Sequence, residues 1–166
     1  MALKLNSSIT KIVTKSGTEI TKVVRKSDGA VLWTKARPYY VDIPSNPLTD
    51  ITNPTNHEYT VTIRNGYYYL CAKKNPNANH FGVAEGTVSL PTQGCNKVNV
   101  KYTYINAGEV KINDQVIGGG TYDTDVNGTI TFDCSGDTFT LTPRVIEQTE
   151  YYTATLQITE IYFYYE

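Results

Sequence analysis

Apolar and polar residues alternate along most of the chain from residue 58 onward. In residues 58–64 every second residue is apolar, and the turn dipeptide Asn65-Gly66 follows directly. A period of two residues indicates a strand with one buried face, and Asn-Gly favours a tight hairpin turn. This segment therefore predicts a hairpin whose second strand covers residues 67–72.

The same kind of pattern continues to the end of the chain. Short β-branched and aromatic runs are separated by turn residues such as Asn, Asp and Gly. We expect further strands at residues 81–90, 98–105, 109–112, 129–133, 138–142 and 151–166. Many short strands with regular turns predict an all-β fold, an antiparallel β-sandwich of jelly-roll or Ig-like type. Helix should be nearly absent, because runs of helix formers at helical spacing are missing.

The last predicted strand changes phase part-way along. Ile158 ends one series of alternating apolar residues, and Ile161 begins a second series that is out of step with the first. A β-bulge near Thr159 or Glu160 would add one residue and turn both series toward the core.

Tyrosine is abundant, with 14 in 166 residues. Tyr67, Tyr68 and Tyr69 are consecutive, and neighbours on a strand point to opposite faces, so at least one lies outside the core. An outward Tyr offers an apolar ring and a hydroxyl, which suits sugars and protein surfaces. We therefore take these three as candidate ligand-binding residues, and the outward Tyr162 and Tyr164 as candidate assembly contacts. The alternative is that Tyr is simply tolerated on a sheet surface.

The first 37 residues contain an internal repeat. Residues 9–17 and 20–29 both begin with Ile-Thr-Lys and end in a Ser-Gly or Ser-Asp-Gly turn, and residues 30–34 add a third apolar run. This repeat predicts a small three-stranded β-meander. Such a sheet is too small for a core of its own, so we expect it to pack on something else. The candidate assembly contacts in this arm are Ile9, Lys11, Ile20, Lys22 and Trp33.

Charge is distributed unevenly, although the net charge is only −1. Residues 1–37 contain eight Lys or Arg and two acidic residues, a net charge of +6, and the remainder carries −7. A basic arm is attracted to an acidic neighbour, including a second copy of the same chain, in a salt-sensitive manner. The alternative is an arm that is simply well solvated.

Four prolines between residues 38 and 57 predict a connector, because proline has no backbone N–H for a regular ladder. A proline-rich connector is semi-rigid and would hold the arm away from the rest of the chain. We therefore divide the chain into a basic β arm at residues 1–37, a Pro/Asn-rich connector at 38–57 and a β-sandwich domain at 58–166.

Signals of catalysis, membrane insertion and nucleic-acid binding are missing from the sequence. The two histidines, His57 and His80, lie in predicted loops without a nucleophile motif. No stretch approaches the roughly 18 apolar residues of a membrane span, and the first residues lack the apolar region of a secretion signal. The basic arm interleaves Lys with Ile and Val rather than with stacking aromatics. We expect a non-enzymatic protein that binds neither membrane nor nucleic acid.

Three cysteines, Cys71, Cys95 and Cys134, are an odd number at wide spacings. This arrangement fits reduced thiols better than a disulfide framework. One disulfide bridge stays open as an alternative.

The sharpest local motif is residues 123–128, Asp-Thr-Asp-Val-Asn-Gly, which matches the first six positions of an EF-hand calcium loop. Asp123, Asp125 and Asn127 would be the calcium ligands, but Cys134 stands where the loop needs a glutamate. We favour a hairpin turn in which Asn127 and Gly128 supply positive φ. Calcium is the alternative, and no other cofactor is expected.

The arm resembles the leader of small virion proteins of tailed bacteriophages. The resemblance lies in residues 9–13 with Gly17, residues 20–24 with Gly29, and residues 31–33. It implies an N-terminal attachment element that carries a β-sandwich, as in head decoration, fibre, tail or baseplate proteins. We therefore expect a virion structural protein, assembled in the host cytoplasm, that forms a homo-oligomer and docks on other virion proteins through its arm.

The body of the chain is similar in outline to carbohydrate-binding jelly rolls, in residues 59–63, 110–115 and 156–161. This resemblance implies the alternative function, a stand-alone carbohydrate-binding module that uses exposed tyrosines and has a cell-surface glycan as its partner. A third hypothesis, a β-sandwich hydrolase, would need a carboxylate pair that nothing in the sequence selects.

Overall fold

The computed structural model is almost entirely β-sheet. It describes residues 12–14, 16, 19, 20, 22–24, 26, 27, 31–34, 36–52, 58–73, 82–120, 122, 124–148 and 153–166. The strands are β1 (Ile12–Val13), β2 (Glu19–Ile20), β3 (Lys22–Val24), β4 (Val31–Thr34), β5 (Tyr39–Tyr40), β6 (Thr49–Thr52), β7 (Glu58–Arg64), β8 (Tyr67–Lys73), β9 (Gly82–Pro91), β10 (Lys97–Ile105), β11 (Glu109–Ile112), β12 (Gln115–Gly118), β13 (Val126–Asp133), β14 (Thr138–Leu141), β15 (Pro143–Glu147) and β16 (Thr153–Tyr164). The described residues contain one short 3-10 helix, η1 (Ile43–Ser45), and no helix among them could cross a membrane.

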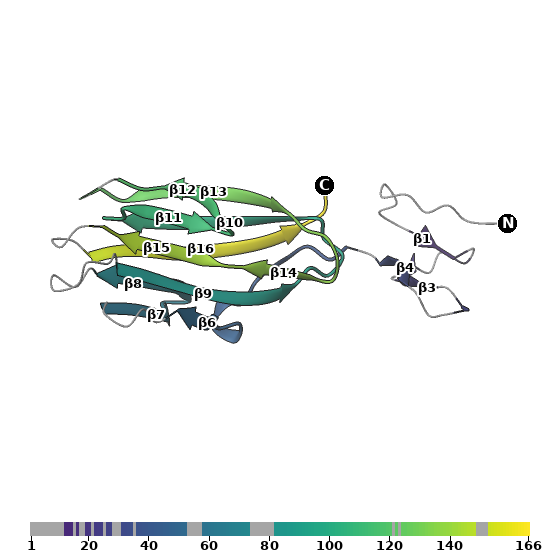
Figure 1. The fold of residues 1–166 in the computed structure, drawn as a ribbon. Coiled ribbons are helices and arrows are strands. Elements are labelled where there is room, and N and C mark those ends of the chain that lie inside the picture. The colour runs from purple at the N-terminus through teal and green to yellow at the C-terminus, as the bar shows by residue number, and fades with distance from the viewer. Residues whose placement is uncertain are drawn as a thin grey trace.

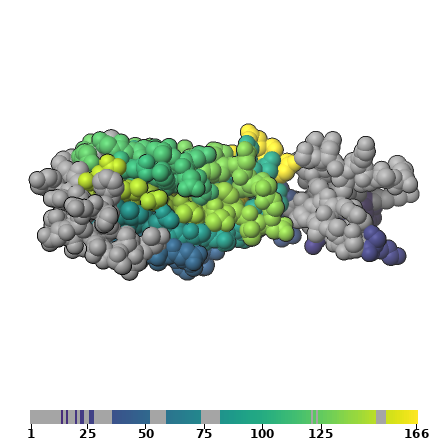
Figure 2. All heavy atoms as spheres, viewed as in Figure 1, coloured from purple at the N-terminus to yellow at the C-terminus, as the bar shows by residue number. Residues whose placement is uncertain are grey.

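Two antiparallel sheets pack face to face as a sandwich (Figure 1). The first, here called the β16 sheet, has the order β13-β10-β16-β8-β7, with β5 also beside β16. The second, the β9 sheet, has the order β12-β11-β15-β9-β14, with β6 beside β9. The space-filling view shows the sandwich as one elongated body (Figure 2). The expected all-β antiparallel sandwich is therefore confirmed.

From β8 onward the chain passes repeatedly from one sheet to the other. β8, β10, β13 and β16 belong to the β16 sheet, whereas β9, β11, β12, β14 and β15 belong to the β9 sheet. Most consecutive strands therefore lie on opposite sides of the core, which is the connectivity typical of jelly rolls.

Strands β14 and β15 behave as one long strand along β9. Their register runs without a shift from Thr138 opposite Pro91 to Glu147 opposite Gly82. The interruption falls just before Pro143, which has no N–H to donate to a ladder. The predicted strand, residues 138–142, ends just before this proline, whereas the chain continues as a strand beyond it.

The core between the sheets is built from the inward side chains of both layers. Its largest fully buried members include Tyr68, Leu70, Leu90, Ile112, Leu141, Leu156, Ile158, Ile161 and Phe163. The central strand β16 contributes four of these, so its burial holds the two layers together.

A β-bulge lets both halves of β16 face the core. Lys101 of β10 pairs with Glu160. Its neighbour Tyr102 pairs with Ile158, which leaves Thr159 as the extra residue. The bulge predicted at Thr159 or Glu160 is therefore confirmed.

The segment predicted as a connector, residues 38–57, takes part in the sandwich where it is described. β5 pairs with β16, β6 pairs with β9, and the side chains of Ile43 and Leu48 are buried in the core. Pro44 and Pro47 lie between the two strands rather than inside them, so they leave both ladders intact. For these residues the expectation of a separate connector is wrong.

The described part of the arm forms two small antiparallel sheets. β1 pairs with β2, and β3 pairs with β4. The second strand of the predicted meander is thus divided into β2 and β3, which pair with the strands before and after it. Among the described residues these strands pair with no strand of the sandwich, and they lie beyond one end of it (Figure 1). The boundary between the arm and the rest of the chain, at residue 37, stays a prediction.

Replacement of Leu156 by Ala should lower the free energy of unfolding by about 2–5 kcal/mol, because it removes a fully buried side chain and leaves a cavity. The neighbouring Thr155, which points away from the core, provides the control, and T155A should cost less than about 1 kcal/mol. Urea unfolding followed by circular dichroism measures both. Equal losses for the two variants would show that β16 is not the central strand of the core.

Candidate functional site

One surface of the β16 sheet, here called the outer face, points away from the core. Successive side chains of a strand point to opposite sides, and from Tyr67 to Lys73 the residues of β8 alternate between exposed or half-buried and fully buried. β16 shows the same alternation on each side of its bulge. The outer face therefore carries the side chains that core packing does not use.

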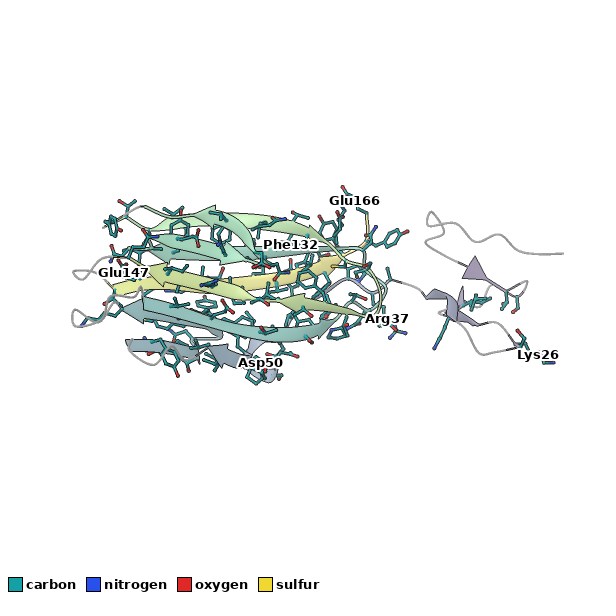
Figure 3. The ribbon with its side chains drawn as sticks, viewed as in Figure 1. Lys26, Arg37, Asp50, Phe132, Glu147 and Glu166 are labelled. Carbon is teal, nitrogen blue, oxygen red and sulfur yellow. The ribbon has the colours of Figure 1, made fainter. Side chains whose placement is uncertain are left out.

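Three tyrosines lie in a row at one end of the outer face, and we call them the tyrosine row. The ring centroids of Tyr40 and Tyr162 are 4.5 Å apart. Those of Tyr162 and Tyr164 are 5.8 Å apart, with 7° between the ring planes. Tyr40 is 64% exposed. Glu166, just beyond the row, lies at the end of the sandwich nearest the arm, and Glu147 lies at the opposite end (Figure 3).

The position of Tyr40 depends on its neighbour Tyr39. β5 pairs with β16 through two residues, and the Tyr39 ring stacks on the buried Phe163, with ring centroids 5.1 Å apart. Burial raises the pKa of Tyr39 to about 12, so its hydroxyl stays protonated and donates a hydrogen bond to the carbonyl of Pro91. With Tyr39 fixed inward, strand alternation directs Tyr40 outward.

Polar side chains occupy the outer face beside the tyrosine row. The Asn99 Oδ1 atom accepts hydrogen bonds from the hydroxyls of Thr131 at 2.7 Å and Tyr164 at 3.5 Å. Further along, the Thr103 hydroxyl donates to Asn127 Oδ1 at 2.5 Å. These bonds hold amide groups in fixed orientations on β10 and β13, where they can meet a ligand that is rich in hydroxyls.

Two shallow depressions mark the middle of the outer face. One, of about 240 Å³, is lined by Arg64, Asn65, Tyr67, Tyr69 and Gln157. The other, of about 360 Å³, is lined by Lys101, Tyr102, Thr103, Asn127, Gly128, Thr129 and Thr159. Gln157 and Thr159 are two residues apart on β16, so the depressions adjoin across this strand.

The smaller depression contains a cation stacked on an aromatic ring. The Arg64 Cζ atom lies 4.0 Å from the centroid of the Tyr69 ring, a cation–π contact. Burial raises the pKa of the Tyr69 hydroxyl, and the nearby Arg64 guanidinium opposes that rise. Tyr67, at the mouth of the depression, is 39% exposed.

Two further cations of the outer face, Lys97 and Lys101, are in ion pairs. Lys97 Nζ lies 2.8 Å from Asp133 Oδ1 and 3.6 Å from Glu166 Oε2. Lys101 Nζ lies 2.6 Å from Glu160 Oε1. These contacts with the carboxylates raise the pKa of both lysines, so both lysines stay protonated near neutral pH.

The opposite surface, on the β9 sheet, has a different character. Among its described residues no aromatic side chain points outward. Its polar residues include ion pairs of Arg144 with Glu85 at 3.2 Å and of Lys111 with Glu109 at 2.9 Å. Exposed tyrosines therefore distinguish the outer face from the other side of the sandwich.

The structure divides the candidate ligand-binding residues Tyr67, Tyr68 and Tyr69. Tyr67 and Tyr69 lie on the outer face, whereas Tyr68 is fully buried and donates a hydrogen bond to the carbonyl of Asn46. The prediction that Tyr68 binds a ligand is therefore wrong, because strand alternation turns its side chain into the core. Tyr40 and Arg64 were not among the predicted ligand-binding residues. Arg64 could have been predicted as an outward residue from the alternation of apolar and polar residues at 58–64.

The residues proposed for calcium do not form a calcium loop or a turn where they are described. Asn127 and Gly128 lie within β13, and Gly128 does not have a positive φ. The hairpin turn expected there is therefore wrong. Glycine is required for another reason, because a Cβ at this position would come within 2.4 Å of the Tyr102 ring. Asp125 is exposed, and Asp123 lies outside the described residues.

The predicted assembly residues lie on separate parts of the chain. Ile20 is in β2, Lys22 is in β3 and Trp33 is in β4. Ile9 and Lys11 lie outside the described residues. Tyr162 and Tyr164 belong to the tyrosine row on the sandwich, so the described candidates do not form one surface.

Some solved structures of known proteins are similar to this chain at low sequence identity. Neither a protein-family model nor a curated protein sequence matches the chain. The chain is similar to a low-affinity xylan-binding module, CBM86, from Roseburia intestinalis, with 13% identity, 78% of this chain and 96% of that chain covered, and a TM-score of 0.41. It is similar to a family 35 carbohydrate-binding module from Clostridium thermocellum, with 12% identity, coverage of 79% and 100%, and a TM-score of 0.34. It is also similar to a family 29 carbohydrate-binding module, with 16% identity, 78% of this chain and 90% of that chain covered, and a TM-score of 0.35. The fold assignment rests on the strand pairing of this chain.

The three cysteines are free thiols, as expected, and we expect them to react slowly in the folded protein. Burial raises the pKa of Cys71 and Cys95, and raises that of Cys134 to about 11 with smaller effects of Cys95 and Asp133. Only the thiolate is nucleophilic, so at pH 8 roughly one Cys134 thiol in a thousand is reactive.

Iodoacetamide labelling at pH 8 with peptide mapping tests this expectation. Cys134 should react about 100-fold faster after unfolding in urea, because its pKa then returns toward 9. Labelling of Cys134 at the same rate in the folded and unfolded protein would contradict the burial described above.

Proposed function

We propose that the protein is a non-catalytic carbohydrate-binding module whose outer face binds a glycan chain. The tyrosine row carries the proposal, because it places three aromatic rings side by side on a sheet surface that the core does not use. A tyrosine ring offers an apolar face for the C–H groups of a sugar and a hydroxyl for its polar groups. No outward aromatic side chain is described on the opposite sheet, so the outer face is the surface suited to such a ligand.

The polar residues of the outer face fit the hydroxyl groups of a glycan. Asn99 and Asn127 are held by hydrogen bonds from Thr131 and Thr103, which leaves their amide NH₂ groups as donors for a ligand. Such preorganised donors lose little entropy when a ligand binds. The adjoining depressions extend from β7 to β13, so a chain of several sugar units has room to cross the sheet.

The charged residues favour binding without hydrolysis. Glycosidases use two carboxyl groups that flank the scissile bond, one of them with a raised pKa. On the outer face Glu160 and Asp133 are each held by a lysine, at 2.6 Å and 2.8 Å. Each carboxylate is therefore engaged in an ion pair and is not placed to act as a general acid or base.

We expect Y162A to weaken glycan binding by about 3- to 10-fold, the loss typical of one aromatic contact. Tyr162 is the central ring of the row, so its removal also releases Tyr40 and Tyr164. Affinity gel electrophoresis against a panel of soluble plant and bacterial polysaccharides, followed by calorimetry on those that bind, measures the effect.

The matched control for this test is V116A, which removes an exposed apolar side chain from the β9 sheet. It should leave binding unchanged. Failure of the natural protein to bind any polysaccharide, or equal binding by Y162A, would exclude the outer face as a glycan site.

A second function, in virion assembly, is favoured by the arm. Its described strands pair only with one another, and residues 1–37 carry a net charge of +6. We propose that the arm docks on an acidic neighbour, a sister subunit or another virion protein, and that the sandwich is thereby displayed on a phage particle assembled in the host cytoplasm. The two functions are compatible, because they use different parts of the chain.

Light scattering of the full chain and of a chain beginning at Pro38 tests the docking role of the arm. The full chain should form a defined oligomer at low salt that dissociates at high salt, since attraction between exposed charges is screened. The truncated chain, which retains β5 from Tyr39, should be a monomer. Identical masses for both chains at low salt would show that the arm does not drive self-association.

A further inference from the structure

Arg64 differs from Lys97 and Lys101 of the outer face in having no acidic partner among the described residues. Lys97 and Lys101 each contact a carboxylate within 3 Å. Among the described residues no carboxylate lies within salt-bridge distance of Arg64. The side chain is exposed at the edge of the sheet and held against the Tyr69 ring. Its charge is therefore positioned but not neutralised.

The surroundings of Arg64 form a small site with hydrogen-bonding groups. The depression of about 240 Å³ is lined by Asn65, Tyr67, Tyr69 and Gln157 in addition to Arg64, and none of these residues is acidic. A guanidinium that stacks on a ring keeps its N–H donors at its edge. These donors match the two oxygens of a carboxylate in a bidentate pair.

We propose that this depression binds the carboxylate of an acidic sugar, such as a uronic acid unit, within the glycan that crosses the outer face. The proposal rests on the proposed function and names the class of glycan. Arg64 pairs with the sugar carboxylate, Tyr67 lies at the mouth of the depression, and the Gln157 amide reaches the ring hydroxyls. Lys97 and Lys101 already have carboxylate partners, and Arg64 is the cation that lines the smaller depression, so Arg64 selects for charge there.

The test compares polysaccharides that differ only in their carboxyl groups. Polygalacturonate, alginate and glucuronoxylan are each measured by calorimetry beside their carboxyl-reduced forms, at low and at moderate salt. We expect at least one acidic form to bind about tenfold or more tightly than its reduced form, the difference that one charged hydrogen-bonded pair supplies. This preference should weaken as salt rises.

Variants assign the preference to Arg64. R64Q should abolish the difference in affinity between the acidic and the reduced forms. R64K keeps the charge but lacks the planar guanidinium group, which donates two parallel hydrogen bonds to a carboxylate. It should therefore retain only part of the preference for the acidic form. K111Q removes one positive charge from the β9 sheet, away from the proposed site, and should retain the full preference. Unfolding midpoints in urea show that each variant is folded.

The possible results separate this inference from the function on which it rests. Binding of reduced and acidic forms with equal affinity would overturn the acidic-sugar site and leave glycan binding in place. Equal loss of preference in R64Q and K111Q, or equally tight binding of dextran sulfate, would overturn it in favour of unspecific attraction to polyanions. Failure to bind any of the six polysaccharides, or any other glycan in the panel, would overturn both.

Discussion

The burial of one side of β16 is the interaction on which the rest of the structure depends. Its side chains from Ala154 to Phe163 fill the centre of the core, and β10, β8 and β5 all pair with its edges. A strand of twelve residues cannot keep one face inward unless its alternation stays in step, and here the bulge at Thr159 restores it. Without that extra residue the two aromatic residues that now form part of the outer surface, Tyr162 and Tyr164, would turn into the core, and Phe163 would turn out of it.

This constraint also creates the candidate binding surface. Because apolar residues occupy the inward positions, the side chains at the outward positions are not needed for core packing. On the β9 sheet those positions hold ion pairs and threonines, whereas on the β16 sheet they hold tyrosines, amides and Arg64. The difference between the two sides is consistent with one face that meets a ligand and one that meets water.

Sequence patterns predicted the sandwich, most of its strands and the bulge, because these follow from local alternation of apolar and polar residues. They failed where a distant partner decides the outcome. Tyr39 and Tyr40 form a strand only because β16 lies beside them, and Pro143 is tolerated because the chain can lose one ladder bond there. Gly128 suggested a turn, yet its lack of a side chain makes room for Tyr102 of the adjacent strand. The tyrosine row joins residues 122 positions apart in the chain, so no local motif could reveal it.

The short pairing of β5 has a mechanical consequence. Tyr39 and Tyr40 come shortly after the arm. A load on the arm would act first on Ala36 and on the hydrogen bond from the Arg37 N–H to the Gln93 carbonyl, and then on this two-residue strand. Tension would separate β5 from β16 before it reached the long strands of the core, and Tyr40 would leave the row at the same moment. A ligand that contacts both Tyr40 and Tyr162 would hold β5 against β16 from the outer face. Ligand binding would therefore increase the force needed to pull the arm away from the sandwich.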